Sequence, residues 1–390
     1  MQVPTLKWSL LSFTFTFTFT FLLVLLSLNP ASSAAVCNTD DQKSLLEIKY
    51  HFNNASTFTT WDPNTDCCTN WSGIQCDAQG RVTMLANSIA NDVVGEIPPA
   101  MGELPYLQFL AFSNLPQLSG TIPSFLSKLT NLQHLDLSLN NLTGPIPDFL
   151  SQLKDLDDID LSSNSLTGSI PSSLSQLPKL RTINLGTNKL SGPIPPSLGS
   201  IKTLVQIYFY SNSLSGSIPS SLSRLHELNE LALWDNKLTG TIPASFGSFR
   251  NSDISLDLSS NKLSGSIPRS FGKANITQLD ISKNKFTGDA SFLFSRDKTV
   301  LSSIVMSNNL FKFDFSKVDL PLGLKRMDIS HNMIFGSLPE RLGQLPLYRI
   351  DVSFNQLCGK IPTGRRLKQF DAAKFSNNKC LCGLPLPPCN

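Results

Sequence analysis

The chain has 390 residues, of which 41% are hydrophobic and 16% charged. Its net charge of +3 at pH 7 is too small to indicate nucleic-acid binding. A chain of this length can bury a large core, and an internal repeat would let one array exceed the usual size of a single domain.

Residues 1–35 are expected to form a secretory signal peptide. Lys7 precedes the apolar run FTFTFTFTFLLVLLSL, and the small residues ASSAA that follow offer a cleavage point after Ala34 or Ala35. An uncleaved anchor is the alternative, because Trp8–Leu28 is nearly long enough to span a bilayer, but small residues follow it at once. No second apolar span follows, so we expect a secreted, extracellular protein without a membrane span in its mature form.

Residues 36–80 are predicted to form an N-terminal cysteine-rich cap. Thr39 and Gln42 have the spacing of a capping box at the start of an amphipathic helix. The segment WDPNTDCCTNWSGIQC follows, and we expect its Trp61 and Trp71 to pack over the open end of the first repeat.

All eight cysteines lie near the two ends of the mature chain. They are Cys37, Cys67, Cys68, Cys76, Cys358, Cys380, Cys382 and Cys389. Disulfides formed in an oxidising compartment would seal the terminal repeats, whose apolar faces have no further repeat to cover them. Zinc binding is the weaker interpretation, because only His51 lies near these cysteines, and we expect no metal site.

Between the caps, residues 81–362 repeat the frame L-x-x-L-x-L-x-x-N-x-L-x-G-x-I-P. Its asparagines recur every 23 to 25 residues, at Asn140, Asn164, Asn188, Asn212, Asn236, Asn261, Asn284, Asn309, Asn332 and Asn355. This period predicts a leucine-rich α/β solenoid. The expected strand starts, near Val82, Leu107, Leu132, Leu156, Leu180, Leu204, Leu228, Asp253, Ile276, Leu301, Leu324 and Leu347, give about twelve coils. Residues 363–390 are predicted to form a C-terminal cysteine-rich cap.

Each coil is expected to contribute one short strand to a parallel sheet. Alternation places Leu135 and Leu137 inward, and His134, Asp136 and Ser138 outward. Because a buried leucine contributes only about 1.5 to 3 kcal/mol, a coil should be stable only within a stack. The repeated asparagine side chains should satisfy backbone groups of neighbouring coils as a continuous ladder.

The outward strand positions form a candidate partner-binding face. They include His134, Asp136, Asp157, Asp158, Asp160, Tyr208, Tyr210, Glu230, Trp234 and Asp235. Exposed aromatics beside acids on a rigid sheet are typical of protein-binding hot spots, although scattered exposed aromatics also occur without a function. Asp158 and Asp160 also suggest glycoside cleavage, but an open solenoid offers no deep pocket, so we expect no catalytic residue and no cofactor.

Two further sets of residues stand out beside the strand face. Lysines follow four of the ladder asparagines, at Lys189, Lys237, Lys262 and Lys285. They should stack along one edge, where they would either meet a polyanion or simply keep the array soluble. Glycosylation sequons stand at Asn54, Asn70, Asn141 and Asn275.

Several segments are narrower signals than the repeat itself, namely WDPNTDCCTNWSGIQC, NNLFKFDFSKVDLP, LCGKIPTG and CLCGLPLPPC. With them, the mature chain resembles the polygalacturonase-inhibiting proteins of plants. The resemblance implies a plant-type right-handed superhelix with a concave parallel sheet and disulfide-sealed caps. It also implies a secreted cell-wall protein of plant defence that binds fungal or insect polygalacturonases. Neighbouring cysteines would pair as Cys37–Cys67, Cys68–Cys76, Cys358–Cys380 and Cys382–Cys389.

The family that the chain resembles usually has ten coils, so the two additional coils would lengthen the binding face. Two other functions remain open at this point. An ice-binding role would need a flat, regular array of small polar groups, which the uneven charges and aromatics argue against. A ligand-binding or signalling role without enzymatic activity is the second.

Overall fold

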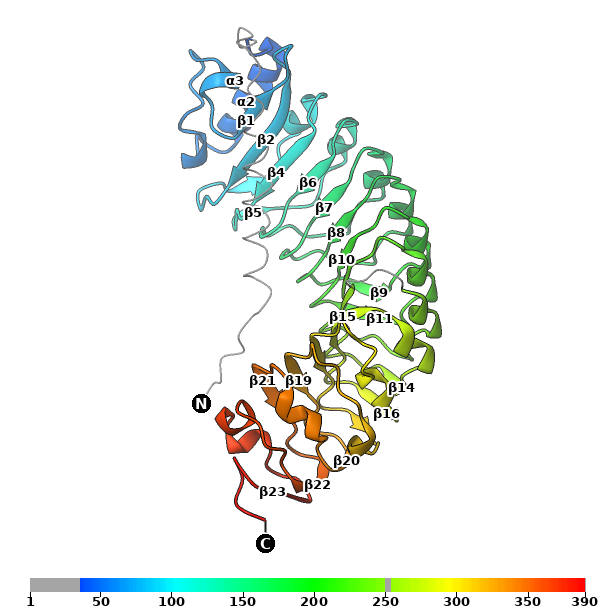
Figure 1. The fold of residues 1–390 in the computed structure, drawn as a ribbon. Helices are drawn as coiled ribbons and strands as arrows, with labels where there is room; N and C mark the ends of the chain where they lie inside the picture. The colour runs from blue at the N-terminus through cyan, green and yellow to red at the C-terminus, as the bar shows by residue number, and fades with distance from the viewer. Residues whose placement is uncertain (1–35, 250–253, 390) are drawn as a thin grey trace.

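The computed structural model describes residues 36–249 and 254–389, which form a curved solenoid (Figure 1). The predicted signal peptide and the predicted strand start at Asp253 lie outside the described residues. The parallel sheet lines the concave side, and short 3₁₀ helices line the convex side.

The described residues form twelve parallel strands, one for each coil, which confirms the predicted architecture. From coil 1 to coil 12 they are β2 (Val82–Ser88), β4 (Phe109–Ser113), β6 (His134–Asp136), β7 (Asp158–Asp160), β8 (Thr182–Asn184), β10 (Gln206–Tyr208), β12 (Glu230–Ala232), β13 (Ile254–Asp257), β15 (Ile276–Asp280), β17 (Ser303–Val305), β19 (Arg326–Asp328) and β21 (Arg349–Asp351). An antiparallel strand of the N-terminal cap, β1 (Ile74–Cys76), pairs with β2 and covers the edge of the sheet.

The remainder of each coil runs along a flank and then over the convex side. The flank strands are β3 (Gly95–Glu96), β5 (Leu118–Ser119), β9 (Ser191–Pro193), β11 (Ser213–Ser215), β14 (Ser264–Ser266), β16 (Lys285–Gly288), β18 (Leu310–Phe311), β20 (Phe335–Gly336), β22 (Gln356–Lys360) and β23 (Cys380–Cys382). The convex 3₁₀ helices are η3 (Pro99–Glu103), η4 (Ser124–Lys128), η5 (Asp148–Gln152), η6 (Ser172–Gln176), η7 (Pro196–Ser200), η8 (Ser220–Arg224), η9 (Ala244–Ser248), η10 (Arg269–Lys273), η11 (Ser291–Phe294), η12 (Phe315–Lys317) and η13 (Glu340–Gln344). In most coils the proline of the repeat stands just before the helix, where it ends the flank pairing.

The predicted alternation of side chains is clear in β6. Leu135 and Leu137 are fully buried, as predicted, while His134 and Asp136 are partly exposed on the concave side. Ser138 was predicted to face outward, but it is buried, because β6 ends at Asp136 and the alternation does not extend beyond it.

The asparagine ladder is present and is longer than predicted. The Asn236 amide donates to the carbonyl oxygens of Phe209 (2.9 Å) and Leu233 (3.2 Å), and its side-chain oxygen accepts from the Leu214 N–H (2.9 Å). Asn378 continues the same pattern into the C-terminal cap. The ladder therefore supplies partners for buried backbone groups from coil 3 to the end of the stack.

The residue before each ladder asparagine adopts a left-handed backbone conformation, with φ between 49° and 58°. We call these the rim residues. They are Leu139, Ser163, Thr187, Ser211, Asp235, Ser260, Lys283, Asn308, His331, Phe354 and Asn377. None is glycine, although glycine is the residue for which this conformation costs least.

The two caps close the ends of the core. Helix α2 (Thr39–His51) begins after Asn38, whose side chain accepts from two N–H groups, so the predicted cap at Thr39 is wrong by one residue. Trp61 and Trp71 are buried and stacked, with ring centroids 5.3 Å apart. The N-terminal cap also holds η2 (Ser56–Phe58) and α3 (Cys67–Asn70), and the C-terminal cap holds η14 (Leu367–Gln369) and η15 (Ala372–Lys374).

All four disulfides have the pairing that the family resemblance implied. They are Cys37–Cys67, Cys68–Cys76, Cys358–Cys380 and Cys382–Cys389. The sulfurs of Cys37, Cys67 and Cys68 lie close enough together to resemble a metal site, but each already belongs to a disulfide.

Candidate protein-binding surface

The concave face presents its side chains in rows that run along the stack, because neighbouring strands pair in register. The first row is His134, Asp158, Thr182, Gln206, Glu230, Ser255, Gln278, Ser303, Arg326 and Arg349. The second row is Asp136, Asp160, Asn184, Tyr208, Ala232, Asp257, Asp280, Val305, Asp328 and Asp351. Adjacent members of a row stand about 4.8 Å apart, so each row forms a continuous surface.

Coils 3 and 4 place a histidine among acids. His134 Nδ1 lies 2.9 Å from Asp158 Oδ2, and its ring stacks on Phe109 with centroids 4.2 Å apart. Burial alone would lower the pKa of His134, but Asp158, with Asp136 and Asp157, raises it overall. In the described part of the chain, the buried Nε2 has no hydrogen-bond partner. The structure thus brings the predicted acidic residues together around one imidazole.

Asp160 extends this acidic cluster toward coil 5. Burial raises the pKa of Asp160 to about 6, although its carboxylate accepts hydrogen bonds from the Ser162 N–H and the Asn184 amide, both at 2.9 Å. Burial and the neighbouring Asp158 likewise raise the pKa of Asp157. The charge of coils 3 and 4 therefore changes in the mildly acidic range.

The raised pKa of Asp160 predicts a pH-dependent stability. Between about pH 4 and 6 the folded state retains a proton that the unfolded state has lost, so the free energy of unfolding should fall as the pH rises through this window. Asp160→Asn should make the loss of stability between pH 4 and pH 7 smaller, as measured by urea unfolding. Glu227→Gln, at an exposed position, is the control. An unchanged pH profile for Asp160→Asn would contradict the assignment.

Tyr210 and Trp234 form an aromatic stack on coils 6 and 7. Their ring centroids are 4.7 Å apart and their planes differ by 4°. Tyr210 packs over Gly186, where an added Cβ would lie 2.4 Å from the tyrosine ring, so only glycine leaves room for it. Both aromatic side chains remain partly exposed, and they form the large apolar contact area of this face.

Tyr208 does not belong to the exposed aromatic patch, and the prediction that it does is wrong. Only 6% of the residue is exposed, and its hydroxyl donates to Glu230 Oε2 at 2.6 Å. The opposite residue in register is Ala232, whose small side chain leaves space for the tyrosine to lie against the next strand. Asp235 is an exposed rim residue and accepts a hydrogen bond from the Ser211 hydroxyl at 3.0 Å.

Sequence reasoning missed six charged residues in the C-terminal half of the face, namely Asp257, Asp280, Asp328 and Asp351 in the second row and Arg326 and Arg349 in the first. Asp257 and Asp280 stand opposite each other in the second row, and burial raises the pKa of both carboxyls. Arg326 and Arg349 stand opposite each other in the first row. The aspartates occupy the frame position of Asp136, and the arginines occupy that of His134. Extending the two rows to coil 12 would therefore have identified all of these residues.

The predicted lysine row lies on the flank beside the concave face. The backbone N–H of Lys189, Lys237, Lys262 and Lys285 donates in each case to a carbonyl of the preceding coil. All four residues are exposed. The row is interrupted in coil 6, where Ser213 takes the equivalent position.

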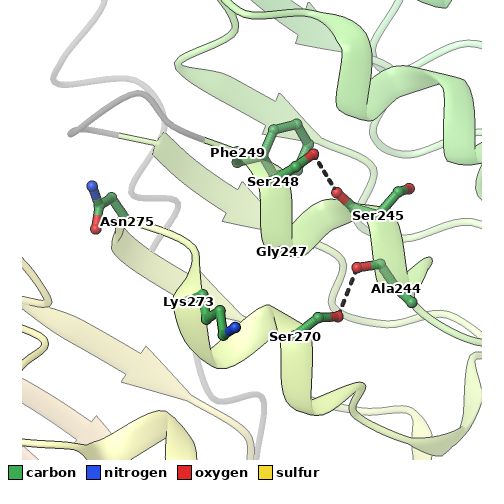
Figure 2. A pocket seen from close by; sticks show the side chains of 8 residues that line it. All are labelled: Ala244, Ser245, Gly247, Ser248, Phe249, Ser270, Lys273 and Asn275. Atoms are coloured by element: carbon green, nitrogen blue, oxygen red, sulfur yellow. Dashed lines mark hydrogen bonds between the residues drawn. The ribbon is translucent and has the colours of Figure 1, made fainter.

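The four sequon asparagines Asn54, Asn70, Asn141 and Asn275 are all exposed. Asn275 lies at the edge of a pocket of about 600 Å³ between η9 and η10, on the convex side (Figure 2). Serine hydroxyls donate to backbone carbonyls at its wall, from Ser248 to Ser245 and from Ser270 to Ala244, both at 2.7 Å. Among the described residues that line the pocket, Lys273 is the one that carries a charge.

Within residues 36–249 and 254–389, no helix has the length and hydropathy needed to cross a bilayer.

Two kinds of family model match this chain. The leucine-rich repeat N-terminal domain model matches residues 38–77, and leucine-rich repeat models match 130–190, 203–225, 227–249, 254–274 and 323–345. Among solved structures, a plant ice-binding protein is 38% identical with a TM-score of 0.59, over 91% of this chain and 98% of that one. The plant peptide hormone receptor RGFR1 is 34% identical with a TM-score of 0.66, over 73% of this chain and 46% of the receptor.

Full-length relatives carry a more specific name. Polygalacturonase inhibitor 1 of Arabidopsis thaliana is 47% identical over 365 residues, which cover 93% of this chain and 95% of that protein. The polygalacturonase inhibitor of Pyrus communis is 46% identical over 93% of this chain and 94% of its own length. Repeat architecture, paired disulfides and full-length similarity agree, and the chain belongs to the family of leucine-rich repeat polygalacturonase inhibitors.

Proposed function

We propose that this protein binds and inhibits polygalacturonases through its concave face. The observation that carries the proposal is the Tyr210–Trp234 stack, which stands two coils from the acidic cluster around His134 and Asp158 on one continuous sheet. Aromatic anchors beside charged residues are the arrangement that dominates binding energy at protein interfaces. The names of the relatives support the identity of the target.

Inhibition on this surface needs no chemistry from the inhibitor. A hydrogen-bonded sheet closed by two disulfides at each end is already ordered, so little conformational entropy is lost on binding. The Asp158 carboxylate pairs with His134, and the Asp160 carboxylate accepts hydrogen bonds from Ser162 and Asn184, so both carboxylates already have partners within the protein. We infer that the protein is not an enzyme and that it acts by covering the surface of one.

The remaining parts of the proposal concern location and a second ligand. We infer that residues 1–35 direct secretion to the plant cell wall, where the caps (36–80 and 363–390) protect the array (81–362). Four disulfides and four exposed sequons support an extracellular environment. Polygalacturonate is the polyanion that the exposed lysine row would bind, because each lysine projects from an equivalent flank position.

The likeness to a plant ice-binding protein supports a second candidate function. Ice binding would require a regular array, whereas the concave face carries a stacked Trp234, a buried Tyr208 and both signs of charge. Thermal hysteresis in a solution of the purified protein would favour this second function.

The test is an inhibition assay with the purified, secreted protein. A panel of fungal and insect polygalacturonases is incubated with it, and the release of reducing ends from polygalacturonate is followed. A pectate lyase acting on the same substrate is the control, because sequestration of substrate by the lysine row would slow both enzymes. Slower release by at least one polygalacturonase, with the lyase unaffected, supports the proposal. No inhibition across a broad panel refutes it.

A further inference from the structure

Two arginines stand at the C-terminal end of the concave face. Arg326 and Arg349 stand directly opposite each other on β19 and β21. Among the residues that the structure describes, neither guanidinium makes a hydrogen bond or an ion pair. Two adjacent guanidinium groups with free donors form a surface that is ready to accept an anion.

The unpaired state of Arg326 is unusual because part of the group is buried. Its Nε is inaccessible to solvent and has no hydrogen-bond partner in residues 36–249 and 254–389. Ser303 stands opposite Arg326 on β17 and is also buried, as is Val305 in the second row. Arg326 therefore lies in a part of the face where little side-chain surface is exposed. A buried donor without an acceptor costs free energy, and such groups in native proteins call for an explanation.

The nearby acids do not neutralise this pair. Asp328 Oδ1 accepts from the Ser330 N–H (3.1 Å) and hydroxyl (2.7 Å). Asp351 Oδ2 accepts from Lys374 Nζ at 2.9 Å. The charge of Arg326 lowers the pKa of both Asp257 and Asp280 against the larger rise caused by burial, but among the described residues Arg326 forms no ion pair with either. An external acceptor cannot reach the buried Nε of Arg326, but Arg326 is otherwise partly exposed and Arg349 is exposed, so the remaining donors of the two guanidinium groups can meet one.

We propose that Arg326 and Arg349 bind carboxylates on the surface of the captured enzyme, an inference that rests on the proposed function. A guanidinium group binds a carboxylate through two parallel hydrogen bonds, which a lysine cannot do. Exposed Lys325 and Tyr348 stand beside the arginines and extend the contact area. The concave face thus has two poles: acidic coils 3 and 4 take basic residues of the enzyme, and coils 11 and 12 take acidic ones.

The distance between the poles indicates one large partner. Seven strand steps separate β7 from β19, which is about 34 Å along the sheet. A globular protein of about 300 residues has a radius of gyration of about 19 Å, so one enzyme molecule can reach both poles at once. Charges of opposite sign at two separated points fix the orientation of a bound protein and speed its association.

The experiment compares matched charge reversals in the full secreted protein. The variant Arg326→Glu/Arg349→Glu reverses the charge of the basic pole on coils 11 and 12. The control Arg224→Glu/Arg296→Glu makes the same change in net charge at exposed residues away from the concave face. Binding to the inhibited polygalacturonase is measured by biolayer interferometry at low and high salt. At about 50 mM salt we expect the pole variant to bind about tenfold or more weakly and the control to change less than about twofold, with the difference narrowing at about 500 mM.

Two further variants separate charge from folding. Arg326→Glu introduces an acid near Asp280, so Arg349→Glu alone, at an exposed position, provides a reversal that leaves the buried acids unchanged. Arg326→Lys/Arg349→Lys keeps the charge but loses the planar fork, and should recover part of the affinity. Acidic residues of the enzyme are then neutralised one at a time. At least one of these neutralised enzymes should bind the parent protein more weakly and bind Arg326→Glu/Arg349→Glu with unchanged affinity.

The outcomes distinguish the two proposals. One outcome is that the parent protein inhibits an enzyme while Arg326→Glu/Arg349→Glu binds that enzyme as well as the control Arg224→Glu/Arg296→Glu does. This result would refute the role of the two arginines and leave the proposed function standing. If the reversal abolishes binding of free oligogalacturonate but not of the enzyme, the arginines serve a uronate and the inference is also refuted. If the parent captures no polygalacturonase, the proposed function fails, and this inference fails with it.

Discussion

Replacing Leu135 by alanine is expected to lower the free energy of unfolding by about 2 to 5 kcal/mol. Leu135 is fully buried between neighbouring coils on β6, and its loss would leave a cavity that the hydrogen-bonded sheet cannot easily close. In a stack, each coil is stabilised by its neighbours, so one cavity weakens two interfaces. Denaturant unfolding followed by circular dichroism measures the effect.

Leu139→Ala is the matched control for this prediction, because it makes the same substitution in the same coil. Leu139 is a rim residue with 51% of its surface exposed, and its loss should cost less than about 0.5 kcal/mol. Equal destabilisation by the two substitutions would show that the strand register described here is wrong.

Trp234→Ala is expected to weaken capture of a polygalacturonase by about 2 kcal/mol or more, which corresponds to about a thirtyfold loss of affinity. Trp234 stacks on Tyr210, and its large ring is partly exposed on the concave face. The exposed part of the Trp234 ring would become buried only when the enzyme binds, so its removal should have little effect on the stability of the fold. Calorimetric titration with the inhibited enzyme measures the loss.

Three variants serve as controls for Trp234→Ala. Trp234→Phe retains a ring that can stack on Tyr210 and should keep most of the affinity. Tyr50→Ala removes an aromatic residue of helix α2 that is 54% exposed and lies off the face, so it should be neutral. Lys262→Ala, on the flank, should mainly change the salt dependence. Full affinity in Trp234→Ala would exclude the aromatic stack from the interface.

The features that the sequence could predict are those written once per coil. The period of the asparagines determines the number of strands, and the Leu-x-Leu alternation determines which side chains are buried, as Leu135 and Leu137 show. The ladder follows because an asparagine recurring beside each strand meets the same backbone groups in every coil. Such features depend on neighbours that the repeat itself specifies.

The features that could not be predicted depend on residues in adjacent coils that the repeat does not specify. Alternation places Tyr208 on the concave side, but its burial depends on Ala232 and Glu230 in the next coil. The Tyr210 ring fits over coil 5 because Gly186 stands there, at a frame position where coils 3, 4 and 8 to 12 carry serine. The arginine pair differs from these features, because a comparison of equivalent positions across all twelve coils would have revealed it from the sequence.

The rim residues make the surface of this protein variable without any change in its fold. Side chains as different as those of Ser163, Asp235, Lys283, His331 and Phe354 occupy the same left-handed conformation, each at a cost of about 1 kcal/mol or more relative to a more favourable backbone geometry. The chain accepts this cost in eleven successive turns while keeping a side chain in each. The rim residues can therefore be substituted one coil at a time without a change of fold. They are suitable positions to randomise in a library that is screened for binding to new target proteins.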